Sequence, residues 1–260
     1  YGTSWMVDPP SSKMQDGILT FFLDATASGL IPTENKTIAI ISEDSDWGKS
    51  VRNAWVNVIE DNDWKVVVDE VVSSGEADFY SILQNVKKQD PDIIKIEFTS
   101  VTSGAALVKQ IDELGMNGYI VFGGYYMKQS EFYGLVGNLA NYHLNILESV
   151  DKTFEDNLLS KYSNASPTTA VWSYDAIHIA AEAYARAKSL DKAAVNIAIG
   201  ETDYEGALMR TVFDEKDHFT ISGEGYKYYG AAQYFDGSFT TIFPYDTAKS
   251  EFKLTPDWVK

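Results

Sequence analysis

The chain has 260 residues and no cysteine, and its 38 acidic and 21 basic residues give a formal net charge of -17. Without cysteine it cannot form disulfides, a catalytic thiolate or a cysteine metal site, and the negative charge disfavours nucleic acid and anionic membrane surfaces as partners. No apolar run reaches 18 residues, so we expect no membrane span, and the length suits one large domain or two small ones.

The first half of the chain alternates between the patterns of helices and strands. Apolar residues at 51, 54, 55, 58 and 59 have the spacing of an amphipathic helix, and the β-branched run before them is typical of a buried strand. In chain order we predict a helix at 11–30, a strand at 36–42, a helix at 46–59, a strand at 64–72, a helix at 78–86, a strand at 91–98, a helix at 102–114 and a strand at 118–124. This alternation predicts an α/β fold, a Rossmann-like parallel sheet with helices on both faces.

The second half of the chain is less regular. We predict a short helix at 131–139, a strand at 142–150, helices at 151–163, 168–190 and 191–200, and two strands within 226–244. The dipeptide Asp236-Gly237 between the last two strands is typical of a hairpin turn.

Three loops follow strands of the predicted parallel sheet, where open α/β sheets bind their ligands. They are SEDSDWG at 42–48, FTSVTSG at 98–104 and FGGYY at 122–126. Each combines hydroxyl groups, glycine or aromatic rings, a mixture that is typical of small-molecule sites and also of ordinary turns.

The segment EDSDWGKS ends like a phosphate-binding loop. Such a loop needs a glycine where this chain has Glu43, and the neighbouring carboxylates of Asp44 and Asp46 would repel a nucleotide. We therefore predict that Asp46 caps the following helix, and that Trp47 either stands at the edge of the sheet or packs under the loop.

Catalytic and metal-binding patterns are sparse. His143, His178 and His218 are far apart and lack metal-ligand spacing, and no nucleophile elbow or dinucleotide fingerprint follows a predicted strand. We predict no metal, no cofactor and no catalytic residue. An enzyme that uses Asp46 or Glu97 as a base stays open as an alternative.

Several segments resemble a known family. The residues that carry the resemblance are IAIISEDSDWG, GEADF, KKQDPD, KQIDELG, VWSYDAIHIAAEAYARA and YEGALMRTVFDEKDHF. They occur in order over most of the chain, and they are similar to type I periplasmic solute-binding proteins, the leucine/isoleucine/valine-binding group of ABC-transporter receptors.

The resemblance implies two α/β lobes. Residues 30–150 would form a complete second lobe, and 1–29 and 151–260 would supply a crossover helix and the later elements of a first lobe whose leading part is missing. We therefore expect a truncated product, or one that associates with itself through the exposed edges of the incomplete lobe.

The resemblance also implies a ligand site. Trp47 replaces the tyrosine that covers the ligand in relatives, and Gly124 or Tyr125 stands where branched-chain amino acid receptors carry an acidic residue for the ligand's ammonium group. Recognition of a cation would then fall to Glu97, to Asp46 or to an aromatic face. The full set of expected ligand-binding residues is Trp47, Glu97, Phe98, Thr99, Ser100, Gly124 and Tyr125.

The function that the resemblance implies is an extracytoplasmic, non-enzymatic receptor. It would bind an amino acid or a related small polar or aromatic molecule and deliver it to an ABC permease. A ligand-sensing domain of a receptor or regulator on the same fold is the alternative among binding proteins.

Overall fold

The structure, a computed structural model, describes residues 2–148, 150–163, 165–223 and 225–258. It divides into two compact units. The smaller unit is Tyr1–Asp16 with Glu148–Tyr229, and the larger unit is Gly17–Leu147 with Gly230–Lys260. These boundaries differ from the predicted lobes, because residues 17–29 and 230–260 pack with the larger unit.

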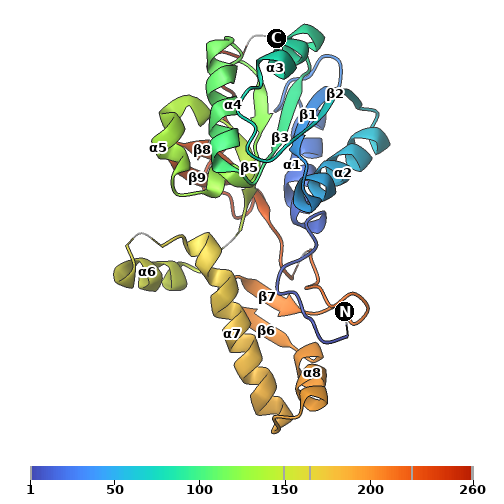
Figure 1. Ribbon diagram of the computed structural model, residues 1–260, viewed down its shortest axis with the longest axis vertical. Helices are drawn as coiled ribbons and strands as arrows, with labels where there is room; N and C mark the ends of the chain where they lie inside the picture. Colours follow the sequence, from blue (N-terminus) through green and yellow to red (C-terminus); the bar gives the residue numbers. More distant parts are fainter. Residues whose placement is uncertain (1, 149, 164, 224, 259–260) are drawn as a thin grey trace. The chain divides into compact units, whose positions relative to one another are not determined.

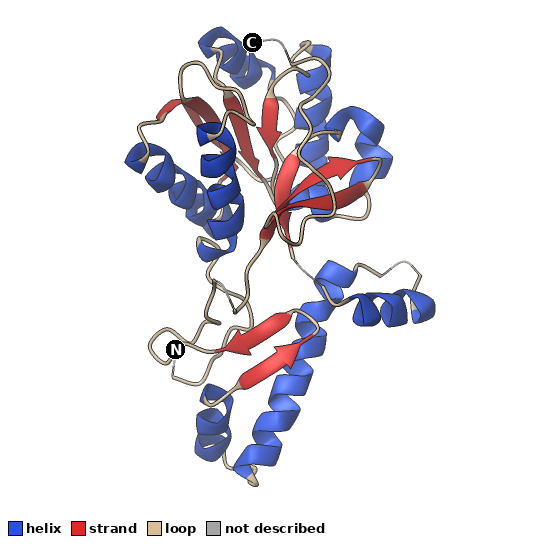
Figure 2. Cartoon of the chain, turned by 180° about the vertical axis from the view of Figure 1, so that it is seen from behind, coloured by secondary structure: helices blue, strands red, loops and turns tan. Residues whose placement is uncertain are grey.

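The larger unit is built on a seven-stranded sheet with the order β2-β1-β3-β4-β5-β8-β9 (Figures 1 and 2). Five strands pair in parallel: β1 Thr37–Glu43, β2 Lys65–Val72, β3 Ile93–Glu97, β4 Ile120–Phe122 and β5 Leu144–Leu147. The predicted parallel α/β sheet is therefore confirmed. Residue 149, near the end of the strand predicted at 142–150, lies outside the described residues.

A hairpin completes the sheet. Strands β8 Gly230–Phe235 and β9 Ser238–Phe243 pair antiparallel, and β8 also pairs antiparallel with β5. Asp236 and Gly237 both have positive φ angles, as a tight turn between two strands requires, so the predicted hairpin is confirmed. The pairing of β8 with β5 is the reason that residues 230–260 belong to the larger unit.

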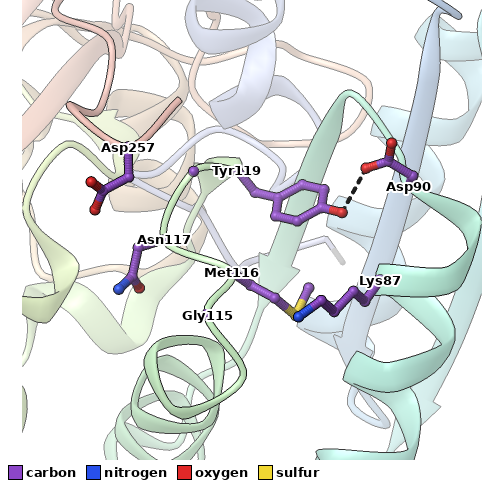
Figure 3. Close-up of a pocket in the computed structure, with 8 residues that line it drawn as sticks. Lys87, Asp90, Gly115, Met116, Asn117, Tyr119 and Asp257 are labelled. Carbon is purple, nitrogen blue, oxygen red and sulfur yellow. Dashed lines mark hydrogen bonds between the residues drawn. The ribbon is translucent and has the colours of Figure 1, made fainter. Parts of the chain in front are cut away.

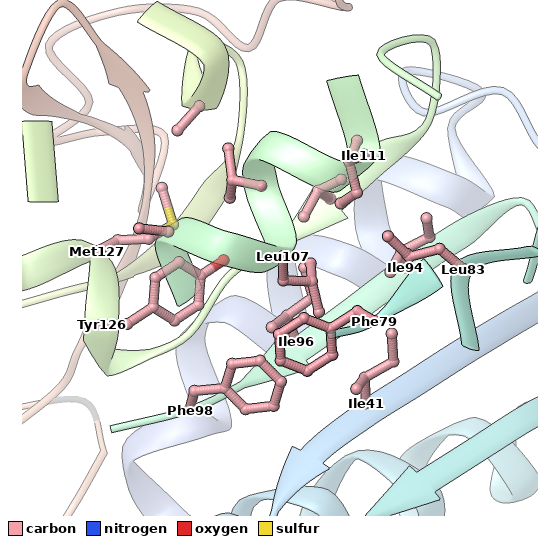
Figure 4. Close-up of a cluster of buried hydrophobic side chains, with 14 of the residues drawn as sticks. Ile41, Phe79, Leu83, Ile94, Ile96, Phe98, Leu107, Ile111, Tyr126 and Met127 are labelled. Atoms are coloured by element: carbon pink, nitrogen blue, oxygen red, sulfur yellow. The ribbon is translucent and has the colours of Figure 1, made fainter. Parts of the chain in front are cut away.

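Helices cover both faces of this sheet (Figure 1). They are α1 Asp16–Ala27, α2 Asp46–Asp61, α3 Tyr80–Gln89, α4 Val101–Glu113 and α5 Phe132–Val136, with 3-10 turns η2 Tyr125–Lys128 and η3 Gly137–Ala140. The 3-10 turn η1 Lys13–Gln15 precedes α1 in the chain and belongs to the smaller unit. On one face, Phe22 of α1 packs against Trp55 of α2 and Phe122 of β4. On the other face, α3 and α4 enclose a buried apolar cluster that includes Ile41 and Ile94 (Figure 4).

Two helices begin at serines that the sequence analysis did not choose. Ser45 has extended backbone angles and its Oγ accepts a hydrogen bond from Gly48 N at 3.0 Å, so it caps α2 in place of Asp46, which is already helical. Ser100 caps α4 in the same way through Ser103 N at 3.3 Å, two residues before the start predicted at residue 102. Both caps place a helix N-terminus at the carboxyl edge of the sheet.

The smaller unit combines three helices with a two-stranded sheet (Figure 2). The helices are α6 Lys152–Lys161, α7 Pro167–Ala187 and α8 Lys192–Gly200, and the antiparallel strands are β6 Asp203–Gly206 and β7 Met209–Val212. Asp175 of α7 is fully buried, and its carboxylate accepts hydrogen bonds from Ala207 N and Leu208 N, both at 2.9 Å. This carboxylate joins α7 to the turn between the two strands.

Candidate functional site

Three of the expected residues meet at the carboxyl edge of the large sheet. The indole N–H of Trp47, at the start of α2, donates a hydrogen bond to Glu97 Oε1 at the end of β3, at 2.8 Å. The Trp47 and Tyr125 rings have centroids 6.5 Å apart and cross at 67°, and Tyr125 N lies 3.4 Å from the same Glu97 oxygen. Trp47 and Tyr125 are both partly exposed, so they present two aromatic walls at an angle to each other.

A buried lysine that the sequence analysis missed completes this group. Lys95 Nζ donates to Glu97 Oε2 at 2.8 Å and to the carbonyl oxygen of Gly123 at 2.8 Å. The side chains of Lys95 and Glu97 are only 2% and 3% exposed. Burial lowers the pKa of Lys95, and the Glu97 carboxylate opposes that shift. The available sequence signal was two charges two residues apart in an apolar strand, a spacing that places both on one face.

Gly124 leaves room for the Glu97 carboxylate. A Cβ at Gly124 would lie 2.9 Å from Glu97 Oε1 and 3.0 Å from Glu97 Cα, so a larger residue would displace the carboxylate. The Gly124 carbonyl accepts a hydrogen bond from Asn145 Nδ2 at 2.7 Å. A carboxylate therefore does lie beside position 124, at the carboxyl edge of the sheet. It belongs to Glu97 at the end of β3, and not to residue 124 itself.

The hydroxyl residues of the edge already have partners within the chain. Thr99 donates to Glu43 Oε2 through its N–H at 3.1 Å and through its hydroxyl group. Burial raises the pKa of Glu43, but hydrogen bonds from Ser74, Thr99 and Ser100 outweigh it and leave the pKa below its ordinary value. Thr99 is exposed and Ser100 partly exposed, so both still reach the surface.

Phe98 does not line this edge. It is fully buried, and it stacks on Phe79 with centroids 5.5 Å apart and an angle of 23° between the rings (Figure 4). The expectation that Phe98 lines the ligand site therefore does not hold in this structure. The alternation of strand β3 directs this ring into the apolar cluster.

The segment that ends in Gly-Lys-Ser has a structural explanation. A Cβ at Gly48 would overlap the carbonyl oxygen of Glu43, so glycine lets the first turn of α2 approach the end of β1. Lys49 pairs with Asp44 at 2.5 Å on the surface. These local contacts account for Gly48 and Lys49 without a bound phosphate.

The three histidines lie apart from this group. His143 is buried at the start of β5, His178 lies beside Tyr174 on α7, and His218 stacks on Trp5 with centroids 3.8 Å apart. Within the described residues, no three His, Asp or Glu side chains gather closely enough to hold a metal ion.

An open pocket of about 450 Å³ lies near the amino ends of β3 and β4 (Figure 3). Its lining includes Lys87, Met116 and Asn117, and the Tyr119 hydroxyl donates to Asp90 Oδ1 at 2.7 Å across it. None of the expected ligand residues lines this pocket. The lysine of this pocket already has a hydrogen-bond partner, because Lys87 Nζ donates to the carbonyl oxygen of Leu114 at 2.7 Å.

The comparison with protein families agrees with the fold. A family model described as periplasmic binding protein matches residues 22–226. The chain belongs to the periplasmic binding protein family. No match was found among curated protein sequences.

Solved structures of this family share the fold at low sequence identity. A candidate branched-chain amino acid ABC transporter from Silicibacter pomeroyi is 18% identical with a TM-score of 0.87, and the match covers 100% of this chain and 70% of that one. Leucine-binding protein LivK from Thermotoga maritima is 20% identical with a TM-score of 0.73, covering 88% and 66%. An ABC-transporter solute-binding protein from R. palustris, in complex with benzoate, is 13% identical with a TM-score of 0.70, covering 89% and 61%.

The chain thus spans 61% to 70% of the length of these three relatives. The mainly parallel sheet with helices on both faces is the type I periplasmic binding protein fold. In the part of the chain that the structure describes, no helix has the length and apolar character needed to cross a membrane.

Proposed function

We propose that this chain is the extracytoplasmic solute-binding receptor of an ABC transporter. Its family consists of solute-binding proteins, and structural relatives include a leucine-binding protein and a solute-binding protein bound to benzoate. The observation that carries the proposal is the group of Trp47, Glu97 and Tyr125 at the carboxyl edge of the sheet, where α/β folds bind small molecules. The solute class is an amino acid or a related small polar or aromatic compound, and a membrane permease receives it.

In this proposal the solute contacts the partly exposed residues of the edge. Trp47 and Tyr125 supply aromatic walls, and Thr99 and Ser100 supply polar groups. Phe98 and Gly124 would not contact the solute through a side chain. The Phe98 ring is buried in the core, and Gly124, which has no side chain, leaves room for Glu97.

A thermal-shift screen tests the proposal. The probes are the common amino acids, their analogues without the amino group, and aromatic acids, and a solute that binds raises the melting temperature. We expect Trp47→Ala to weaken the best solute by about 30-fold, because a partly buried aromatic anchor contributes about 2 kcal/mol. Tyr133→Ala is the matched control, since that exposed tyrosine lies elsewhere in the larger unit.

Two outcomes would contradict the proposal. If no probe raised the melting temperature, the binding function would be wrong, and if Trp47→Ala left the affinity unchanged, the site would be wrong. A solute that is recovered unchanged after long incubation supports a receptor, whereas its conversion would favour the enzyme alternative with Asp46 as base. A ligand-sensing domain would bind a solute equally well but would not support uptake by vesicles that contain the permease.

Self-association remains a second part of the proposal, with another copy of this chain as the partner. Exposed apolar side chains of the smaller unit support it, among them Ile177 and Tyr184 on α7 and Leu190 after it. Sedimentation analysis would show a dimer that Ile177→Lys and Tyr184→Lys dissociate, and a monomer at all concentrations would contradict it.

A further inference from the structure

The Glu97 carboxylate accepts the hydrogen bond of the Trp47 indole, and both of its oxygens already have hydrogen-bond donors within the chain. Oε1 accepts from Trp47 Nε1 at 2.8 Å and lies 3.4 Å from Tyr125 N. Oε2 accepts from Lys95 Nζ at 2.8 Å. Because the Glu97 side chain is also only 3% exposed, a solute ammonium group could reach it only if a neighbouring group such as the indole moved.

The lysine is fixed from several sides. Besides Glu97, its Nζ donates to Gly123 O at 2.8 Å, which joins the end of β3 to the end of β4. Nζ also lies 5.4 Å from the centroid of the Trp55 ring, a fully buried side chain of α2. Because the lysine is held by the core, the carboxylate on it is a rigid acceptor for the indole N–H.

We propose that Lys95 and Glu97 are positioning residues that hold Trp47 in one orientation, so that the solute meets the face of the indole and not its N–H. The inference rests on the proposed function and deepens it. Glu97 then binds no ammonium group, because its charge is balanced inside the protein by Lys95.

This arrangement selects a class of solute. The indole N–H is used by Glu97, so Trp47 offers the solute only its π surface, at an angle of 67° to the Tyr125 ring. Such a corner favours a flat aromatic or branched apolar group. Asp46, which precedes Trp47 in the first turn of α2, is an acidic residue that does reach solvent.

The first measurement needs no solute. The indole N–H resonance of Trp47 in a proton–nitrogen spectrum is assigned by its loss in Trp47→Phe. We expect it to move upfield in Glu97→Gln and in the double variant Lys95→Met with Glu97→Gln, because an amide oxygen is a weaker acceptor than a carboxylate. Asp46→Asn is the matched control, since it removes a neighbouring carboxylate without touching the indole hydrogen bond. An unchanged resonance in both Glu97 variants would overturn the positioning role.

The second measurement compares solutes that differ only in the amino group. The probe pairs are phenylalanine with 3-phenylpropanoate, and leucine with 4-methylpentanoate. We expect the double variant to weaken both members of a pair by the same factor, about tenfold, the loss expected for one misplaced contact. In a Trp47→Phe background the same double substitution should have no further effect, because Glu97 acts through the indole.

The opposite pattern would overturn the inference. A loss confined to the amino acids, and retained in the Trp47→Phe background, would show that Glu97 binds the ammonium group directly. Glu97→Gln alone leaves Lys95 buried without its carboxylate, so the double variant guards against a failure to fold. A wild-type protein that binds neither member of either pair overturns the class of solute inferred here. Failure of every probe in the thermal-shift screen contradicts the proposed function, and the Trp47 resonance still decides the positioning role.

Discussion

Among the described residues, each unit of the molecule buries one lysine, and the two lysines differ in their partners. Lys95 in the larger unit has a carboxylate and a carbonyl oxygen within 2.8 Å. Lys227 in the smaller unit is fully buried, and its Nζ has no hydrogen-bond partner among the described residues, although it lies 5.0 Å from the Trp172 ring centroid. The buried ammonium group of the larger unit therefore has hydrogen-bond partners within the protein. The buried ammonium group of the smaller unit lacks one among the described residues, and its burial lowers the stability of the folded state.

The apolar side chains show the same contrast. Among the described residues, the four most exposed large apolar side chains lie in the smaller unit: Leu190 at 86%, Ile177 at 69%, Tyr162 at 65% and Ile197 at 64%. The larger unit encloses a cluster of aromatic and branched side chains between the sheet and its helices (Figure 4), and its most exposed large apolar side chain, Tyr245, is 55% exposed. Stability should therefore respond to substitution very differently in the two units.

The largest difference is expected between two apolar truncations. Trp55→Ala should lower the free energy of unfolding by about 3 to 5 kcal/mol, because it removes a fully buried ring that packs on Phe22 and Phe122. Ile197→Ala in the smaller unit should change it by less than about 0.5 kcal/mol, because that side chain is 64% exposed. Urea unfolding measures both, and comparable losses would remove the distinction between the units.

The buried lysine of the smaller unit gives a change of opposite sign. Its pKa is lowered to about 8, first by burial, with Asp175 and Asp8 opposing the shift. The unfolded chain thus holds the proton more tightly, and at pH 7 Lys227→Met should stabilise the protein by about 3 kcal/mol. The gain should shrink as the pH rises from 8 to 10.5, and a destabilised Met variant at pH 7 would contradict it.

Acid should weaken the larger unit through His143. Burial lowers the pKa of this histidine to about 4, against 6.5 ordinarily. Above pH 6.5 both states are neutral, and as the pH falls from 6.5 to 4 only the unfolded state gains a proton, so stability is lost in that window. Relative to wild type, His143→Gln should recover about 3 kcal/mol of that loss, measured by urea unfolding at each pH. Parallel pH profiles would exclude His143 as the cause.

The smallest effect concerns two serine caps. Ser45→Ala should cost about 1 kcal/mol, because its Oγ accepts a hydrogen bond from Gly48 N at the start of α2. Ser166→Ala should cost only a few tenths, because Ser166 precedes α7 without a side-chain hydrogen bond to the helix backbone. Thermal unfolding compares the two variants. Equal losses of stability would mean that the side-chain hydrogen bond of the cap does not distinguish the helix of the larger unit from that of the smaller unit.

Local sequence patterns predicted the parallel strands, the main helices and the hairpin at Asp236-Gly237. The pair β6 and β7 was not predicted, because each strand has four residues and little alternation. The helix starts were displaced, because Ser45 and Asp46 are both good capping residues and the backbone angles decide between them. The lobe boundaries also differ, since the pairing of β8 with β5 depends on residues far apart in the chain.

The sequence by itself determined the fold class, the edge of the sheet where a ligand site is expected, and the aromatic residue types Trp47 and Tyr125 at that edge. These follow from periodicities and turn residues, which act over a few positions. Only the tertiary structure decided that Lys95 neutralises Glu97, that Gly124 makes room for that carboxylate, and that Phe98 belongs to the core. Such assignments depend on burial, which the alternation of a strand does not set by itself, and for Gly124 on a contact with a residue of another strand.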